Sequence, residues 1–488
     1  MRDPMNSRPL AEPCRVALIA WIALAGATWL AAVEPPPPDI ADVRFECPIR
    51  WTERHQVIDG FGASAAFHQA ENLQTYPGEE QRKVLDLLFS QTDGAGLSIV
   101  RNIVGDGGEI GEGKFWGEER NGPTTSIEPR EGVWNWTGDE GQIWFMREAA
   151  KRGTTRYFST AWSPPAWMKT NQSVINGGHL RPDKYQAYAE YLAAYVRGYR
   201  DHHGIEIDAI SPQNEPDIAT DYSSCLWTGE EFHDFLKQAL IPVFQRERIK
   251  ARLVLGEQTY WTDALVLPSL RDPDVAPHVD VVAAHAYTGS NLADLPIISR
   301  SGVFQTAQRL GKTVWQTEVA SFDPEDPRIG EGLYWAKVIH AHLVQGNASA
   351  WFYWWALSYL PDKGSLILLD LQRKTWTVGK RLYAIGNYAR FIRPGSYRVG
   401  AESNPAPGVL ISAFVDPAAN RRIIVAVNDN SVDCQLLFPK VAEAGDRVGA
   451  YRTSASENLG PVQVPGPAAG DLAVSLPGLS VTTFVLSR

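Results

Sequence analysis

Two glutamates occupy positions where their carboxyl groups could work as a pair. Glu215, in the stretch 211–216, and Glu318, in the stretch 313–318, each come just after a β-branched, apolar run that is typical of a buried strand. Hydrolysis of a glycosidic bond needs two such groups, because one acid protonates the leaving oxygen while a second carboxylate meets the cationic sugar carbon. No other set of residues in the sequence is as complete, so we predict a glycosidase.

The elements that would position these glutamates alternate regularly between strand-like and helix-like stretches. Apolar residues recur at helical spacing between the strand-like runs, for example over 182–199 and 229–244. The strand-like runs are 57–62, 96–103, 156–160, 207–211, 252–256, 279–285, 313–317 and 350–354. This alternation indicates a parallel sheet, and eight repeats of it predict an α/β fold of the (β/α)8 TIM-barrel type.

In such a barrel the residues at the carboxyl ends of the strands converge on one site. Glu215 ends the fourth predicted strand and Glu318 the seventh, so both can face one cleft. The other strand exits carry Arg101, Asn102, Trp162, Glu257, Tyr260, His285, Tyr287, Trp354 and Trp355. Arg101, His285 and Trp355 are predicted to contact substrate, although barrel-top packing or a structural salt bridge is the alternative for each. For the two glutamates a catalytic task is favoured, since two unpaired buried carboxylates would otherwise be costly.

A second domain is expected around the barrel. After residue 395 the sequence changes to short apolar strands at 409–415, 422–427, 473–476 and 481–486, separated by Gly, Pro and Asn turns. A strand at 42–54, before the barrel, is predicted to join them. The predicted organisation is a catalytic barrel over 55–393 and a C-terminal sandwich over 394–488, so that a side β-sandwich domain is built from both chain ends.

The N-terminus has the pattern of a secretory signal peptide. Three arginines precede an uncharged run at 16–33, which predicts a signal over 1–32, a proline-rich spacer over 33–41 and a secreted protein, extracellular or periplasmic. An uncleaved membrane anchor is the alternative, because the run approaches spanning length. Cys14 would leave with the signal, and the odd count that remains argues against a disulfide framework, although a bridge between Cys47 and Cys434 stays open.

Composition narrows the classes of partner. The chain of 488 residues has a net charge of -10, from 46 Lys and Arg against 56 Asp and Glu, with no basic stripe for nucleic acid and no polybasic membrane patch. Its 17 tryptophans suit a neutral sugar polymer, because indole faces stack on the apolar faces of pyranose rings. We therefore expect a polysaccharide or glycoside substrate, no nucleic acid, no stable membrane partner after signal cleavage, and a monomer.

The remaining motifs are weaker. The histidines at 202–203 and 340–342 lack the spacing of a metal cluster, so neither a metal nor a cofactor is predicted. Ser64 lies in a stretch like a nucleophile elbow, but the final glycine and a histidine-acid partner set for an esterase are not found. A catalytically silent carbohydrate-binding protein is another alternative, and the intact glutamate pair with Asn214 argues against it.

Six motifs together resemble glycoside hydrolase family 30 over nearly the whole chain after about residue 50. They are DGFGAS at 59–64, AWSPPAWMK at 161–169, PQNEPD at 212–217, HAY at 285–287, WQTE at 315–318 and RFIRPG at 390–395. The resemblance implies a barrel with a side β-sandwich and a retaining mechanism, with Glu215 as acid/base and Glu318 as nucleophile. It also implies that Asn214 bonds the sugar 2-hydroxyl, that Tyr287 holds the nucleophile, and that Trp162 stacks in the cleft.

The substrate is less sharply defined by the sequence. In the bacterial xylanases that the chain resembles, arginines just after a Trp-Trp pair hold a glucuronic acid branch. Here the pair Trp354-Trp355 is followed by a stretch that contains Lys363 and no arginine. We therefore predict a β-linked polysaccharide, xylan, cut without dependence on glucuronate branches. β-1,6-glucan, β-1,6-galactan and glucosylceramide, which other members of the family cleave, stay open, as does endo or exo action.

Overall fold

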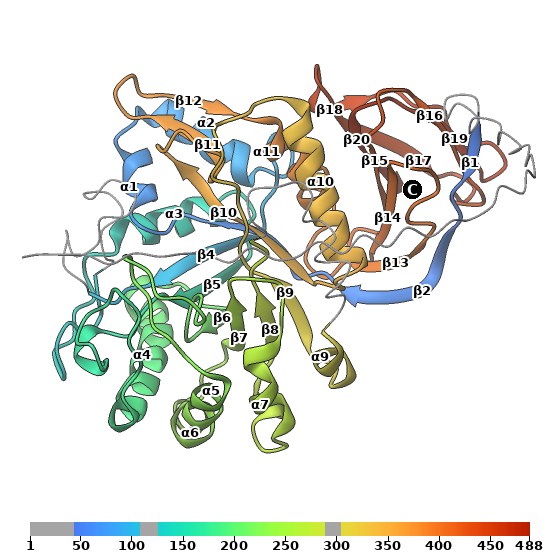
Figure 1. Cartoon of the computed structure of the whole chain (residues 1–488). Helices are drawn as coiled ribbons and strands as arrows, with labels where there is room; N and C mark the ends of the chain where they lie inside the picture. Colours follow the sequence, from blue (N-terminus) through green and yellow to red (C-terminus); the bar gives the residue numbers. More distant parts are fainter. Residues whose placement is uncertain (1–42, 108–124, 288–303) are drawn as a thin grey trace, which may run out of the picture. The chain divides into compact units, whose positions relative to one another are not determined.

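The computed structural model describes residues 43–107, 125–287 and 304–488 (Figure 1). The predicted signal peptide at 1–32 and spacer at 33–41 lie outside these residues. Within the described ranges, no helix combines the length and the apolar character needed to cross a membrane. Cys47, Cys225 and Cys434 are buried, and none of them forms a disulfide in this part of the chain.

Eight parallel strands form a closed barrel, as predicted. The ring is closed by β10, which pairs with β3 on one side and with β9 on the other. In order around the barrel the strands are β3 (Gly60–Ser64), β4 (Ile99–Val104), β5 (Arg156–Ala161), β6 (Ala209–Ser211), β7 (Arg252–Gln258), β8 (Val281–Ala284), β9 (Thr313–Gln316) and β10 (Ala350–Ser358). Each predicted barrel strand overlaps one of these, so the TIM-barrel prediction is confirmed.

Helices surround this barrel (Figure 1). They are α1 (Gln69–Gln74), α2 (Gly78–Phe89), α3 (Glu140–Ala150), α4 (Tyr185–His203), α5 (Gly229–Phe235), α6 (Ile241–Glu247), α7 (Leu267–Arg271), α9 (Gln305–Arg309), α10 (Ile329–Val344) and α11 (Lys380–Ala389). In α4 the tyrosines 188, 191, 195 and 199 recur every three or four residues, and all are buried because this spacing places them on one helix face. The helix ends at Gly204, whose φ of 68° suits the left-handed cap position.

Large and small side chains alternate inside the barrel and fill it. Phe158 packs edge to face on Trp315 and on Phe352, and these two rings pack at a tilt on each other, at centroid distances of 5.4 to 5.8 Å. Small residues such as Ala209 and Ala283 make room for them. Such an interior is a packed core rather than a pore. The chemistry must therefore take place at the carboxyl ends of the strands.

The side β-domain consists of two sheets with residues from both ends of the chain. One sheet has the order β1-β16-β19 and the other the order β18-β17-β20-β15-β14-β13-β2. The strands are β1 (Arg44–Glu46), β2 (Ile49–Val57), β13 (Tyr397–Ala401), β14 (Val409–Asp416), β15 (Arg421–Asn428), β16 (Cys434–Phe438), β17 (Arg447–Thr453), β18 (Asn458–Val462), β19 (Leu472–Leu476) and β20 (Ser480–Ser487). β11 (Ser365–Asp370) and β12 (Thr375–Val378) instead extend the barrel sheet outward from β10. The predicted contribution of both chain ends is confirmed.

The N-terminal strand predicted at 42–54 is wrong in its detail. The structure has two strands there, β1 and β2, which belong to different sheets. Pro48 separates them, because proline has no N–H to donate to a ladder. β2 continues to Val57, beyond the predicted boundary, and β3 starts only at Gly60, whose φ of 140° is unfavourable for other residues. The first barrel strand is therefore shorter at its start than predicted.

Candidate active site

Glu215 projects from a strained turn just after β6. Its φ is 45°, and Glu257 at the end of β7 has a φ of 53°, both in the left-handed region that non-glycine residues rarely adopt. The N–H of Glu215 donates to the carbonyl oxygen of Glu257 at 3.0 Å, which locks the two turns together. Strained backbone of this kind costs about 1–3 kcal/mol per residue and clusters at functional sites. The two strand exits are therefore held in a conformation that the rest of the fold must support.

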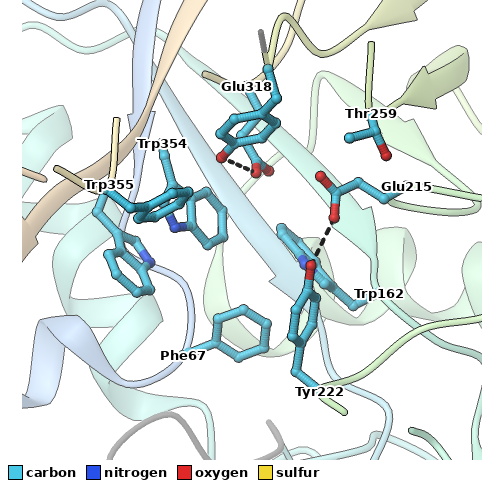
Figure 2. A pocket seen from close by; sticks show the side chains of 10 residues that line it. Phe67, Trp162, Glu215, Tyr222, Thr259, Glu318, Trp354 and Trp355 are labelled. Carbon is cyan, nitrogen blue, oxygen red and sulfur yellow. Dashed lines mark hydrogen bonds between the residues drawn. The ribbon is translucent and has the colours of Figure 1, made fainter. Parts of the chain in front are cut away.

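Glu215 and Glu318 meet in one pocket at the carboxyl ends of the strands. Figure 2 shows their carboxyl groups facing the same space from two sides, with aromatic rings around them. One oxygen of each carboxylate lies within 4.8 Å of the other. The cavity measures about 180 Å³. Its wall residues are Phe67, Trp162, Glu215, Tyr222, Thr259, Tyr287, Glu318, Phe322, Trp354 and Trp355. The barrel thus brings together the two glutamates that the sequence singled out.

Glu318 is surrounded by hydrogen-bond donors. The hydroxyl of Tyr287 donates to its Oε1 at 2.7 Å, and the guanidinium of Arg101 makes a close ion pair with its Oε2. Burial raises the pKa of Glu318, as does the nearby carboxyl of Glu215, while protonated His285, Arg101 and Tyr287 oppose the rise. The hydroxyl of Tyr287 itself has a pKa well above its usual range, because it is buried beside Glu318. It therefore stays a donor.

His285 lies among three carboxyl groups. Its Nδ1 is 3.2 Å from Glu215, and its Nε2 is 3.7 Å from Glu257 and 3.8 Å from Glu318. Burial disfavours a charged imidazole, but Glu318, Glu215 and Glu257 together raise its pKa to about 9. Burial also works against the charge on Glu257, and Arg101 and His285 outweigh it and lower the pKa of that carboxyl. With Arg101, the cluster holds two cations against three carboxyl groups, so a single proton on the Glu215–Glu318 pair makes it neutral.

Tyr222 is a pocket residue that sequence reasoning missed. Its hydroxyl donates to Oε2 of Glu215 at 2.9 Å (Figure 2). The residue lies in the loop that follows Glu215, away from any strand exit and without a periodic pattern, so no signal in the sequence pointed to it. Glu257 carried a weak signal as a strand exit, but its contacts with Arg101 and His285 could be found only in the structure.

The aromatic wall accounts for the remaining predicted contacts. Trp354 and Trp355 stack at 5.1 Å, and Trp162 packs against Trp354 at 5.7 Å. Arg101 lies over the ring of Trp162 at 4.6 Å, so part of that ring already has a partner. Nε1 of Trp355 is buried and has no hydrogen-bond partner among the described residues. A buried, unpaired N–H beside a cavity is free to donate to a bound molecule.

Three predicted residues lie behind the pocket wall rather than on it. Arg101, Asn214 and His285 are almost completely buried and are absent from the wall. The Oδ1 of Asn214 accepts from Arg101 at 2.7 Å, which leaves its amide group as the donor. Of the other strand exits, Asn102 turns away and its Nδ2 lies 3.3 Å from the sulfur of Met146, and Tyr260 is exposed outside the pocket. Of the predicted site residues, some therefore line the pocket and the others lie behind them and hold them in position.

Glu215, His285 and Glu318 could in geometric terms hold a metal ion, because one ligand atom from each lies within 4.8 Å of the others. A metal needs the neutral imidazole. His285 has a pKa of about 9, so near neutral pH it is protonated, with Nδ1 donating to Glu215 and the charge paired with Glu257 and Glu318. The donor set fits an ion-pair cluster better than a metal centre.

Comparisons with known proteins agree with this geometry. The sequence profile of O-Glycosyl hydrolase family 30 matches residues 45–310. The chain is 30% identical over 351 residues to Glucuronoxylanase XynC of Bacillus subtilis, covering 70% of this chain and 76% of that protein. It also resembles the glycoside hydrolase family 30 subfamily 8 xylanase Xyn30A of Clostridium acetobutylicum, with a TM-score of 0.73 and 29% identity over 91% of this chain and 100% of the other.

A second solved structure is similar in the same way. The catalytic domain of GH30 xylanase C from Talaromyces cellulolyticus matches with a TM-score of 0.77 and 26% identity, over 91% of this chain and all of that one. The matches include the segments that carry the barrel, and the family recognised from the six motifs is confirmed. The chain therefore belongs to O-glycosyl hydrolase family 30 and is a β-glycoside hydrolase.

Proposed function

We propose that Glu318 is the nucleophile and Glu215 the acid/base of a retaining double displacement. The observation that carries this is the approach of their carboxylate oxygens within 4.8 Å. Retaining enzymes place the two carboxyl groups roughly 5–5.5 Å apart, whereas inverting enzymes leave about 6.5–9.5 Å for a water molecule. The short separation supports direct attack by one carboxylate on the sugar.

The contacts divide the two roles. Glu318 pairs with Arg101, which is always charged, and accepts from the hydroxyl of Tyr287, so its oxygens are held in place for attack. Glu215 accepts from the hydroxyl of Tyr222 and lies beside His285, and we assign it the role of acid/base. Glu215 is thereby ready to protonate a leaving oxygen while Glu318 is ready to attack carbon.

The reaction then takes two balanced steps. In the first, a carboxylate oxygen of Glu318 bonds to the anomeric carbon, the glycosidic bond breaks, and the proton of Glu215 passes to the leaving oxygen. In the second, Glu215 removes a proton from water, the water oxygen bonds to the anomeric carbon, and the ester bond to Glu318 breaks. Loss of the charge on Glu318 in the intermediate lets Glu215 act as a base. His285 and Arg101 remain as fixed cations throughout.

As substrate we propose xylan, cleaved without dependence on glucuronate branches. The relationship to Glucuronoxylanase XynC supports the polysaccharide class. The residue that could replace a branch-binding arginine, Lys363, is engaged elsewhere, since its Nζ lies 3.2 Å from the buried carboxyl of Glu331 on α10. An ammonium in that ion pair cannot supply the forked, bidentate contact that a carboxylate branch favours.

We further propose that the protein is secreted as a monomer after removal of residues 1–32. The arginine-flanked apolar run at the N-terminus supports export. The family relationship fits an enzyme that meets a polymer outside the cell.

The function is tested with purified protein and four substrates: xylan, β-1,6-glucan, β-1,6-galactan and glucosylceramide, with products identified by mass. We expect release of xylo-oligosaccharides. Cleavage of one of the other three without xylan would refute the substrate but keep the mechanism. Failure on all four, and on aryl β-glycosides, would instead support a catalytically silent carbohydrate-binding protein.

A further inference from the structure

An exposed aromatic stack lies on the outer wall of the barrel. Trp134, in the segment before α3, is 44% exposed, and its neighbour Val133 is 45% exposed. The ring of Trp134 is nearly parallel to that of Trp136, with an angle of 7° and a centroid distance of 6.2 Å. Trp136 in turn stacks on His202 of α4 at 4.7 Å. Trp134 and Val133 thus form a small exposed apolar patch, and an exposed indole face is suited to stacking on a flat partner.

The stack is rigidly supported. The N–H of Asn135 donates to Ile127 at 2.8 Å, and the N–H of Val133 donates to Arg130 at 2.9 Å, so backbone bonds fix the chain on both sides of Trp134. Trp136 packs so tightly on Gly198 of α4 that a Cβ built there would lie 1.8 Å from its ring. The exposed ring is therefore pre-organised, and binding to it would require little ordering of the protein.

A groove along α3 lies near this stack. His202 and His203 lie 6.3 Å apart by ring centroid, and His203 lines a cavity of about 450 Å³ with Trp144, Arg147 and other residues of α3. Its charged residues balance, because two carboxylates (Glu140 and Glu148) stand against two cations (Arg147 and Lys151). Burial and the nearby Arg147 lower the pKa of His203, so the imidazole is neutral near pH 7. The groove thus offers polar groups without a net charge.

This surface is separate from the catalytic pocket. His202 and His203 are the last residues of α4, and the chain leads from there to the amino end of β6. The pocket lies at the opposite, carboxyl ends of the strands, where Glu215 follows β6. A single sugar bound in the pocket cannot contact Trp134, but a long polymer, or a second chain of an insoluble polymer, could.

We propose that Trp134, Trp136 and the adjoining groove of α3 form a second carbohydrate-binding site, which holds a neutral β-linked polysaccharide chain. The flat face of such a chain stacks on the indole of Trp134, and its hydroxyl groups meet the balanced charges of the groove. A charged glycan gains nothing here because the groove has no net charge. The site would keep the enzyme on a polymer surface between cleavage events.

The test compares Trp134→Leu with the wild type, using retention on insoluble xylan and on microcrystalline cellulose, both in the Glu318→Ala background so that the polymer is not degraded. Leucine keeps an apolar side chain but removes the ring. For Trp134→Leu we expect about three- to tenfold weaker retention on at least one polymer, which corresponds to the loss of one aromatic stacking contact. For Trp134→Phe, which keeps an aromatic ring, we expect retention near that of the wild type. Leu310→Ala, at a residue equally exposed elsewhere, is the matched control.

Turnover of a soluble aryl β-glycoside, measured with Glu318 intact, separates this site from catalysis. The Trp134 variants should keep wild-type kcat/KM there, whatever polymer the pocket cleaves. Equal retention of wild type and Trp134→Leu, or no retention of either on both polymers, would overturn the site. A loss of aryl β-glycoside turnover would also overturn it, because Trp134 would then belong to the catalytic machinery. So would a change in the oligomeric state of Trp134→Leu, because the stack would then be a contact between copies of the chain.

Discussion

The hydroxyl of Tyr222 donates to Oε2 of Glu215 at 2.9 Å, from a loop that neither strand exits nor sequence periodicity indicates. This bond orients the carboxyl group of Glu215, which must be in place to transfer a proton to the leaving oxygen. In Tyr222→Phe we expect kcat to fall about three- to tenfold, the effect of one hydrogen bond, with thermal stability nearly unchanged. Steady-state kinetics on an aryl β-glycoside and a thermal unfolding curve provide the two measurements.

Tyr185→Phe is the control for that experiment. Tyr185 is buried on α4, outside the pocket, and packs against Phe235 at 5.5 Å. Its variant should leave kcat unchanged. If Tyr222→Phe also leaves kcat unchanged and only lowers thermal stability, then Tyr222 is a packing residue and does not position the acid/base.

Glu318→Ala should lose nearly all turnover, because Glu215 is the only other carboxylate on the pocket wall among the residues that the structure describes, and it lies on the opposite side. Azide is small enough to occupy the vacated space and attack the anomeric carbon. We expect azide to restore part of the activity on an activated aryl β-glycoside and to give a glycosyl azide of inverted configuration. NMR of the product determines the configuration. A rescued product of retained configuration would show that a different residue is the nucleophile.

Glu215→Ala should respond to the leaving group. Aryl β-glycosides with acidic phenols need no proton to depart, so their first step should be nearly unchanged, whereas substrates with poor leaving groups should slow by about 10²- to 10⁴-fold. Plots of log kcat/KM against the phenol pKa, for the variant and for the wild type, provide the measurement. Equal slopes for the two proteins would contradict the assignment of Glu215 as the acid.

His285 should make the stability of the fold depend on pH. Its folded pKa of about 9 lies above the ordinary value of 6.5, so its stabilisation is fully present below pH 6.5 and is lost as the pH rises through 9. A shift of this size corresponds to about 3 kcal/mol of unfolding free energy. We expect the difference between wild type and His285→Gln, measured in urea, to shrink by about that amount between pH 6 and 10.

His342 provides the contrast, since it is equally buried but has a pKa lowered to about 3 by burial. In the folded protein it is neutral throughout this interval, whereas the unfolded imidazole, with its ordinary pKa of 6.5, still binds a proton at pH 6. The difference between wild type and His342→Gln should therefore change by only about 1 kcal/mol between pH 6 and 10, and in the opposite direction to that of His285→Gln. A His285→Gln difference that behaves like that of His342→Gln would mean that His285 carries no charge in the folded protein.

The last prediction concerns the loop after β10 and the glucuronate branches of xylan. With Lys363 paired to Glu331, the enzyme should cut undecorated xylan and glucuronoxylan at similar rates, at sites unrelated to the branch. Loss of a bidentate contact removes enough binding energy to abolish such a requirement. Mass analysis should show products of many lengths, some without glucuronate and some with glucuronate at varying positions. A ladder in which every product carries one glucuronate at a fixed position would require another residue to bind the branch.

The sequence predicted the barrel well because its strands are buried and strongly apolar. It predicted less of the side domain, where β13, β16, β17 and β18 were missed: β17 and β18 contain glycine or proline and are partly exposed, so neither propensity nor alternation distinguishes them from loops. The division of β1 from β2 at Pro48 was also missed, because one continuous polar-apolar pattern crosses two sheets.

Within the site, position along a strand was predictable and orientation was not. Glu215 and Glu318 could be found because strand exits converge in a barrel. That Arg101 would turn its charge to Glu318 and lie over Trp162, behind the wall, depends on contacts between strands far apart in sequence. The ion pair of Lys363 could not be predicted either, because its partner Glu331 lies on α10, on the other side of β10 in the sequence.

The pairing of β2 with β13 also determines when the molecule can finish folding. Val57 lies beside Tyr397, so an edge strand made early in synthesis stays without a neighbour until the ribosome has produced the whole barrel. Such distant pairing is slow and leaves the growing chain open. An incomplete chain therefore cannot close its last sheet, and β2 keeps an unpaired edge until synthesis has passed β13.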